Sequence, residues 1–213
     1  MNSLSLKIRM VITDDHQIVI DGLTAALNNY PHLEIVGTAT SGPATMSLLQ
    51  RQQTDLLISD VMMPGMDGRE LAQAVKEAFP QVRIIALSMN GDGAQVEKMA
   101  PYIDGYLLKQ CGVTELVNAL KIVAEGGTYF DASVQEEKLR YKRSQQFIKD
   151  TGITPREKQI ILLMEKSYSN KEISSQLCIS TRTVETHRKN ILRKTGTNNL
   201  LTLMKWAYEQ NIL

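Results

Sequence analysis

The stretch Asp55–Gly68, which reads DLLISDVMMPGMDG, restricts the fold of this chain more than any other. Leu56–Ile58 is a short apolar run, typical of a central parallel strand that is covered on both faces. Asp60 stands at the end of this strand. The Pro64–Gly65 pair predicts a tight turn, because proline fixes φ and glycine permits positive φ. Open α/β sheets bind ligands at the carboxyl ends of their strands, so Asp60 is a candidate functional residue.

Strand-like and helix-like segments alternate through residues 1–126, which is typical of a parallel sheet with right-handed crossovers. The segment after the fourth strand is flanked by Gly91, Gly93 and Pro101, and it predicts only a short helix, roughly Ala94–Ala100. We therefore expect an α/β fold with a doubly wound, five-stranded parallel sheet. The expected strands are Lys7–Thr13, Glu34–Ala39, the run that ends at Asp60, Val82–Leu87 and Ile103–Leu108.

Polar residues follow four of the five expected strands. The carboxyl ends of parallel strands share one edge of a sheet, so these side chains are expected to meet there. Three carboxylates at one place repel one another unless a cation lies among them, and oxygen ligands favour Mg²⁺. A nearby lysine and a carboxylate nucleophile suit the transfer of a phosphoryl group to Asp60. The residues concerned are Asp14, Asp15, Asp60, Ser88 and Lys109.

The charges are divided unevenly along the chain. Residues 1–126 hold 9 Lys and Arg against 14 Asp and Glu, a net charge of −5. Residues 151–213 hold 10 against 5, a net charge of +5. This asymmetry favours two domains with different partners, of which the basic one is a candidate for binding a polyanion.

Other features of the sequence exclude several classes of protein. No apolar run reaches the length of a membrane span, and the N-terminus lacks the apolar core of a signal peptide, so we expect a soluble cytoplasmic protein. Cys111 and Cys178 are expected to be reduced and to act as small hydrophobic residues, not as a disulfide or a metal site. His16, which follows the acidic pair, is expected to be a surface residue at the start of a helix.

Residues 127–150 are polar and of mixed charge, and we expect a linker that is partly helical. Its basic residues Lys138, Arg140, Lys142 and Arg143 fit a solvated helix face, with contact to DNA as the alternative.

Residues 151–213 predict four helices. Thr154, Pro155 and Glu157 form a helix start with a capping box. A short second helix from Asn170 and a brief turn lead to a third helix, Thr181–Thr195, which places Val184 and Ile191 inward. A short helix, a turn and a helix with a basic outer face form a helix-turn-helix arrangement. We therefore expect a small all-α, four-helix domain at residues 151–213, after the sheet domain at residues 1–126.

Several of these motifs resemble those of a known family. Asp14-Asp15, Asp60 with MMPGMDG behind it, Ser88 and GYLLK ending at Lys109 resemble the receiver domain of two-component response regulators. The resemblance implies a flavodoxin-like fold in which Asp60 accepts a phosphoryl group from a sensor histidine kinase. It also implies that Asp14, Asp15, Asp60 and the backbone carbonyl of Met62 hold Mg²⁺, that Lys109 binds the phosphoryl oxygen, and that Ser88 and Tyr106 form a switch.

The second half of the chain resembles a different module. TPREKQIILL, SNKEISSQLCIS and TVETHRKNILRKTG are similar to the LuxR-type DNA-binding domain, so the whole chain resembles a response regulator of the NarL/FixJ subfamily. The resemblance implies a transcription regulator that binds promoter DNA, forms a homodimer when active and works with RNA polymerase. The implied base-facing residues are Glu185, Thr186 and Lys189. The other implied DNA-binding residues are Lys171, Arg182, Thr183, Arg188 and Arg193.

Two other functions compete with this interpretation. One is a phosphohydrolase with Asp60 as its nucleophile. Such enzymes need a second acid two residues further on, where this chain has Met62, so we do not expect an enzyme. The other is a regulator that works without phosphorylation and uses its first domain only to dimerise. The complete set of acidic residues argues against this second alternative.

Overall fold

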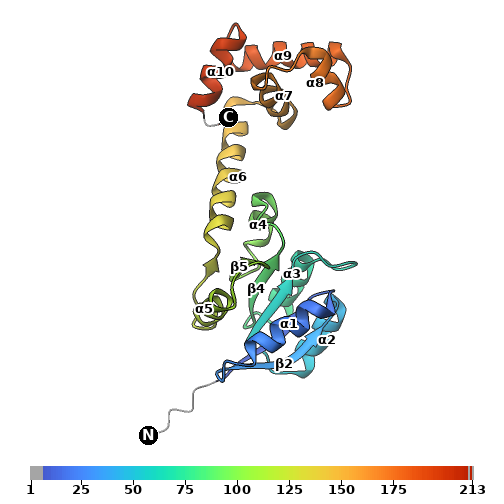
Figure 1. Cartoon of the computed structure of the whole chain (residues 1–213), viewed down its shortest axis with the longest axis vertical. Coiled ribbons are helices and arrows are strands. Elements are labelled where there is room, and N and C mark those ends of the chain that lie inside the picture. Colours follow the sequence, from blue (N-terminus) through green and yellow to red (C-terminus); the bar gives the residue numbers. More distant parts are fainter. Residues whose placement is uncertain (1–6, 211, 213) are drawn as a thin grey trace. The chain divides into compact units, whose positions relative to one another are not determined.

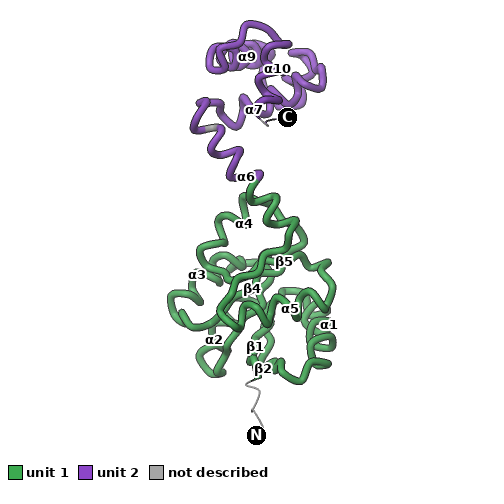
Figure 2. Tube along the Cα trace, turned by 90° about the vertical axis from the view of Figure 1, so that its left-hand side faces the viewer, with its two compact units in different colours: residues 1–139 green, residues 140–213 purple. Residues whose placement is uncertain are grey.

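The computed structural model describes residues 7–210 and 212. It divides into two compact units, residues 1–139 and residues 140–213 (Figure 2). Unit 1 alternates strands and helices (Figure 1) in the order β1 (Ile8–Thr13), α1 (Gln17–Leu27), β2 (Leu33–Ala39), α2 (Gly42–Arg51), β3 (Leu56–Asp60), α3 (Gly68–Ala78), β4 (Arg83–Ser88), α4 (Gly93–Met99), β5 (Gly105–Leu108), α5 (Val113–Ala124) and β6 (Tyr129–Phe130). The chain continues with α6 (Ala132–Thr151), α7 (Pro155–Glu165), α8 (Asn170–Gln176), α9 (Thr181–Thr195) and α10 (Leu200–Glu209).

The strands form one parallel sheet with the order β2-β1-β3-β4-β5-β6. All five residues of β3 are buried, as its continuous apolar run predicts. The strand order reverses direction between β1 and β3. In doubly wound sheets ligands bind at such a reversal, beyond the carboxyl ends of the strands. The predicted fold class, an α/β sheet domain followed by a helical domain, is confirmed.

Both faces of the sheet are covered by helices, because alternate residues of each strand point to opposite sides. Met10 and Ile12 of β1 pack in one apolar core with α1 and α5. Val11, which lies between them, packs in the other core with α2, α3 and α4. Val134, in the first turn of α6, belongs to this second core and is fully buried.

The sheet formed by the described residues has six strands, so the predicted number of five was wrong. The additional strand β6 is two residues long, too short to produce a recognisable pattern of alternation. Gly126, with φ of +92°, turns the chain back after α5. The backbone N–H of Tyr129 then donates to the Asp104 carbonyl at 3.0 Å, and the N–H of Asp131 donates to the Tyr106 carbonyl at 3.0 Å.

Residues 127–150 hold β6 and most of α6, which runs without interruption for 20 residues. The two compact units divide inside this helix, after Leu139. The division of the chain into domains at 1–126, 127–150 and 151–213 stays a prediction.

Unit 2 is built from capped helices around one apolar core. Thr154 and Glu157 form the predicted capping box at the start of α7, and Ser169 with Glu172 forms another at α8. Helix α9 ends at Gly196, whose φ is +66°. Trp206 borders this core, with its ring centroid 5.4 Å from that of Phe147. None of the helices in the described part of the chain combines the length and the apolar composition of a membrane span.

Candidate functional site

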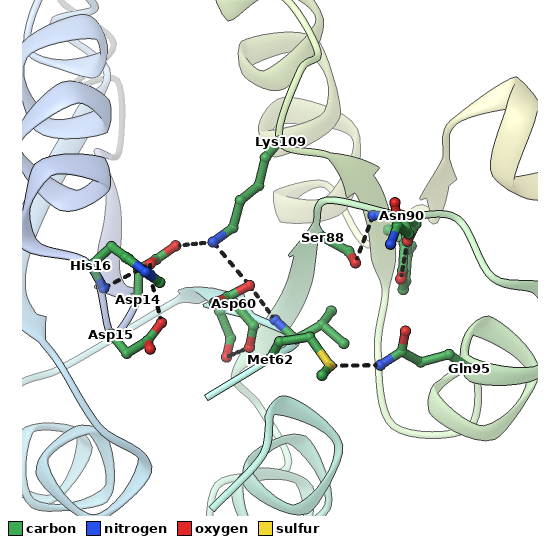
Figure 3. A network of polar contacts seen from close by, with 12 residues as sticks. Asp14, Asp15, His16, Asp60, Met62, Ser88, Asn90, Gln95 and Lys109 are labelled. Carbon is green, nitrogen blue, oxygen red and sulfur yellow. Dashed lines mark hydrogen bonds and ion pairs between the residues drawn. The ribbon is translucent and has the colours of Figure 1, made fainter. Parts of the chain in front are cut away.

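The polar residues that follow the strands of unit 1 gather at one edge of the sheet (Figure 3). The parallel registers explain why, since Thr13 of β1 pairs with Ser59 of β3, Asp60 with Leu87 of β4, and Ser88 with Leu108 of β5. The strands therefore end at nearly the same level. The structure brings together Asp14, Asp15, Asp60, Ser88 and Lys109, all of them predicted site residues.

Lys109 connects two of the three carboxylates. Its Nζ lies 2.6 Å from Asp14 Oδ2 and 3.0 Å from Asp60 Oδ1. The lysine side chain is 13% exposed, and those of Asp14 and Asp60 are 2% and 5% exposed. Coulomb attraction is strong in such a weakly screened place. The cluster holds three carboxylates against one ammonium, so it keeps an excess of negative charge.

Burial and the neighbouring charges shift two ionisable groups of this cluster. Burial raises the pKa of the Asp60 carboxyl, and the negative charge of Asp14 raises it further, while the hydrogen bond from Lys109 opposes both effects. Burial tends to lower the pKa of Lys109, but its bonds to Asp14 and Asp60 outweigh this effect and leave that pKa raised. Asp60 is therefore a carboxylate that a second cation would stabilise.

The backbone around Asp60 is closely packed, which fixes its side chain. The N–H of Val61 donates to Asp60 Oδ1 at 2.8 Å, and the N–H of Gly68 donates to the Val61 carbonyl at 3.0 Å. A Cβ atom at Gly68 would lie 2.3 Å from the carbonyl oxygen of Asp60. Only glycine lets the start of α3 approach the end of β3 this closely.

The acidic residues fit a metal ion. Asp14, Asp15, His16 and Asp60 each offer one ligand atom, and these atoms lie within 4.8 Å of one another. Asp15 Oδ1 is buried and accepts no hydrogen bond from any described residue, although His16 Nδ1 lies 2.9 Å from it. A buried carboxylate oxygen without a donor is costly unless a cation compensates for it. Oxygen ligands on a sheet edge fit Mg²⁺.

Two residues at the rim of the pocket, His16 and Met62, have side-chain contacts that were not predicted from the sequence. His16 was expected to be a surface residue; its side chain is 66% exposed, yet its Nδ1 approaches both Asp14 and Asp15. Only the position of His16 next to the acidic pair could have indicated this contact. Met62, whose carbonyl was expected to bind the metal, lies on the loop after β3, and its exposed side chain approaches Gln95, with 3.3 Å between Sδ and Nε2.

Ser88 and Tyr106 meet at one residue of the loop between β4 and α4. The N–H of Asn90 lies 3.2 Å from Ser88 Oγ, which accepts from it. The Tyr106 hydroxyl, on a fully buried ring, donates to the Asn90 carbonyl at 3.0 Å. Burial raises the pKa of this hydroxyl, so it stays a donor. Ser88 and Tyr106 were predicted from the sequence, but Asn90 was not, because its contacts are made by backbone atoms.

The expected DNA-binding residues of unit 2 lie on α8 and α9. Val184 and Ile191 are buried on the inner face of α9. Arg188 is half-buried, and its guanidinium donates to the side-chain carbonyl of Asn170 at 2.6 Å, an interaction that connects α9 to α8. The remaining expected residues are exposed to solvent, namely Lys171, Arg182, Thr183, Glu185, Thr186, Lys189 and Arg193.

Comparison with protein families identifies both parts of the chain. Residues 10–121 match the family of response regulator receiver domains. Residues 151–207 match the luxR family of bacterial regulatory proteins.

Individual relatives cover nearly the whole chain. The transcriptional regulatory protein MctR of Rhizobium johnstonii is 33% identical over 208 residues, which cover 97% of this chain and 96% of MctR. The response regulator protein VraR of Staphylococcus epidermidis is 29% identical over 209 residues, 98% of this chain and all of VraR.

Solved structures show the same architecture. The response regulator RcsB of Salmonella typhimurium superposes with a TM-score of 0.61 at 26% identity, covering 95% of this chain and 98% of RcsB. A complex of RcsB with DNA has a TM-score of 0.61 at 27% identity and the same coverage. The chain therefore belongs to the two-component response regulators of the NarL/FixJ type, in which a receiver domain precedes a LuxR-type DNA-binding domain that regulates transcription.

Proposed function

We propose that this response regulator accepts a phosphoryl group on Asp60 from a sensor histidine kinase and that this modification controls its binding to promoter DNA. The observation that carries the proposal is the position of Lys109, whose ammonium lies between the carboxylates of Asp14 and Asp60. A buried carboxylate nucleophile beside a fixed cation suits phosphoryl transfer, in which catalysis depends on positioning and on charge stabilisation.

Each residue of the pocket is assigned a separate role in phosphoryl transfer. Lys109 and the Val61 N–H hold Asp60 Oδ1, so we assign the nucleophilic attack to Oδ2. The new bond joins this oxygen to phosphorus while the P–N bond of the donor phosphohistidine breaks, and the leaving nitrogen keeps its electron pair. Lys109 then stabilises negative charge on the transferred group. Asp14, Asp15, Asp60 and the Met62 carbonyl would hold Mg²⁺, which neutralises charge on the phosphoryl oxygens.

The proposed role is regulatory rather than enzymatic. A phosphohydrolase would need a proton donor or acceptor two residues after Asp60, and the thioether of Met62 does neither. Phosphorylation instead adds about 1.5 to 2 negative charges to the pocket. We assign Ser88 Oγ as a hydrogen-bond donor to the phosphoryl group. Ser88 and Tyr106 are both bonded to Asn90 in the loop of residues 89–92, here called the Asn90 loop, and we assign the response to phosphorylation to this loop.

Unit 2 supplies the binding to DNA. We assign base contacts to the exposed Glu185, Thr186 and Lys189, and phosphate contacts to Lys171, Arg182, Thr183 and Arg193. Arg188 is assigned a phosphate contact as well, through the part of its guanidinium that Asn170 leaves available. Lysine suits the acceptor atoms of guanine, and glutamate suits the amino group of cytosine. The +5 charge of residues 151–213 favours binding to the phosphate backbone.

The active form is proposed to be a homodimer in the bacterial cytoplasm, with two DNA-binding domains on half-sites about one helical turn apart. RNA polymerase is the further partner that regulation of transcription requires. The proposed domains are the receiver at residues 1–126, the linker at residues 127–150 and the DNA-binding domain at residues 151–213.

Intact mass spectrometry after incubation with acetyl phosphate and Mg²⁺ tests the phosphorylation. The wild-type chain should gain one phosphoryl group, and the gain should disappear in Asp60→Asn. Asp21→Asn, which changes an exposed acid on α1, is the matched control and should be phosphorylated like wild type. A phosphoryl group that forms equally well on Asp60→Asn would refute the assignment.

Binding titrations with a duplex that the full chain selects from a random pool test the DNA contacts. Lys189→Ala should weaken binding by about 1–3 kcal/mol and relax the base preference at one position. Arg193→Ala should weaken binding to all sequences and reduce the dependence on salt by about one phosphate contact. Lys205→Ala removes the same charge from an exposed position on α10 and should leave the base preference unchanged. Equal effects of Lys189→Ala and Lys205→Ala would exclude α9 as the reading helix.

A further inference from the structure

The loop that contacts the phosphorylation pocket also contacts the first turn of α6. Asn90 is bonded to Ser88 and to Tyr106, and the next residue along the chain is Gly91. A Cβ atom built at Gly91 would lie 3.2 Å from Cγ2 of Val134. The backbone of the loop therefore packs directly against a side chain of α6.

The beginning of α6 is anchored in unit 1 by several contacts. Val134 is fully buried in the apolar core that also contains Val96 of α4 and Tyr106. Lys138 lies with its Nζ 5.1 Å from the centre of the Phe130 ring and 3.9 Å from Glu97 Oε2. These contacts hold residues 132–139 against the same face of unit 1 as α4.

A second connection runs through the sheet. Tyr106 of β5 pairs with Phe130 of β6, and the Tyr106 carbonyl accepts from the N–H of Asp131 at 3.0 Å. Asp131 directly precedes α6, and its side chain accepts from the N–H of Ser133 at 2.7 Å. The same tyrosine that bonds to the Asn90 loop is thus bonded to the residue that caps α6.

We propose that residues 132–139 of α6 are the element on which phosphorylation of Asp60 acts, with Gly91 and Val134 as the positioning residues that pass a shift of the Asn90 loop to the helix. The proposal rests on the proposed function and adds the route by which it reaches the linker helix. Packed cores change between discrete arrangements instead of deforming continuously, so a displacement of the loop backbone has to move Val134. Coupling between two sites is reciprocal, so the docking of α6 also acts on the pocket.

Hydrogen–deuterium exchange on the full chain tests the route directly. Intact mass first establishes whether acetyl phosphate and Mg²⁺ have phosphorylated the sample. In the phosphorylated wild-type chain, the exchange rates of amides 88–92 and of amides 132–139 should both change, the latter by at least about fivefold. A phosphorylated chain in which residues 132–139 exchange as before overturns this inference alone. A chain that accepts no phosphoryl group overturns the proposed function, and this inference with it.

Variants test the contact itself. Val134→Ala should abolish the response of residues 132–139 to phosphorylation while that of residues 88–92 persists. Leu139→Ala is the matched control, because Leu139 is an apolar residue of the same helix that is 54% exposed, and it should respond like wild type. Equal responses of Val134→Ala and wild type would overturn the proposal.

Gly91→Ala keeps the proposal testable if Val134→Ala loosens the whole helix. The added methyl group presses on Val134 and should change the exchange of residues 132–139 several-fold without any phosphoryl group. In a Val134→Ala background the same substitution meets no Cγ2 and should have little effect. An effect of Gly91→Ala that is the same in both backgrounds would contradict a direct contact, because contacting residues give non-additive effects.

Discussion

Removal of the Lys109 ammonium is the perturbation whose consequences the structure defines best. Lys109→Ala leaves Asp14 and Asp60 with side chains that are 2% and 5% exposed and no counter-ion at 2.6 Å and 3.0 Å. Removing one partner of a buried ion pair costs about 3–5 kcal/mol, because the remaining charge is poorly solvated. Lys109 itself is 13% exposed, so water reaches the truncated site and the lower end applies. We expect a loss of about 3 kcal/mol in the free energy of unfolding of unit 1 without Mg²⁺.

Thermal unfolding followed by circular dichroism measures this loss in the full chain. For a domain of this size, about 3 kcal/mol corresponds to a Tm that is lower by about 10 °C. The fluorescence of Trp206, which packs against Phe147 in unit 2, reports separately on the other unit and should be unchanged. Lys98→Ala, on the exposed side of α4, is the matched control and should stay within about 0.5 kcal/mol of wild type.

The loss should depend on pH and on Mg²⁺ in a defined direction. Burial raises the pKa of Asp60, and without Lys109 this pKa rises further. The cost of the unpaired carboxylate is therefore largest above the raised pKa and decreases as the pH falls through it, where Asp60 becomes protonated and neutral. Mg²⁺ should stabilise Lys109→Ala more than wild type, because it replaces the missing positive charge. A loss that is the same at every pH down to the acid unfolding of the chain, and insensitive to Mg²⁺, would refute the electrostatic explanation.

Three further predictions concern packing and charge. Gly68→Ala should destabilise unit 1 by about 2–3 kcal/mol in urea unfolding, since its Cβ would lie 2.3 Å from the Asp60 carbonyl oxygen. Gly22→Ala, whose Cβ meets nothing within 4 Å in α1, should instead stabilise by about 0.5–1 kcal/mol. Glu157→Gln, which breaks the 2.7 Å contact with Lys194, should destabilise unit 2 by about 2 kcal/mol when tryptophan fluorescence is followed. Burial opposes the ionisation of Glu157, but the bonds of its carboxylate to Lys194 and Thr154 outweigh burial and lower its pKa. The stability that this carboxylate contributes is therefore present at neutral pH and is lost as the pH falls through the lowered pKa.

The parts of the fold that depend on local patterns were predictable. The continuous apolar run of β3 predicted a strand covered on both faces, and all of its residues are buried. The parallel arrangement predicted that Asp14, Asp60 and Lys109 would meet at one edge, and Lys109 Nζ lies 2.6 Å from Asp14 Oδ2 and 3.0 Å from Asp60 Oδ1. Both features are visible in a sequence. An apolar run marks a buried strand, and the polar residue that follows it marks the end of that strand.

The parts that depend on tertiary contacts were not predictable in the same way. Strand β6 has only two residues, and it forms because Gly126 returns the chain to β5. Asn90 connects Ser88 to Tyr106 through its backbone N–H and carbonyl, which every residue except proline possesses. The burial of Val134 follows from its neighbour Gly91, 43 positions away in sequence, and no periodic pattern in a polar linker reveals such a contact.

The affinity for a selected duplex, measured before and after treatment with acetyl phosphate and Mg²⁺, tests the central claim most directly. In the wild-type chain the dissociation constant should change by at least about fivefold, the usual lower limit of coupling between two sites. In Asp60→Asn it should stay constant, because no phosphoryl group can form there. An equal response of both chains, or a fully phosphorylated wild type whose affinity is unchanged, would contradict the claim that Asp60 governs the binding of DNA.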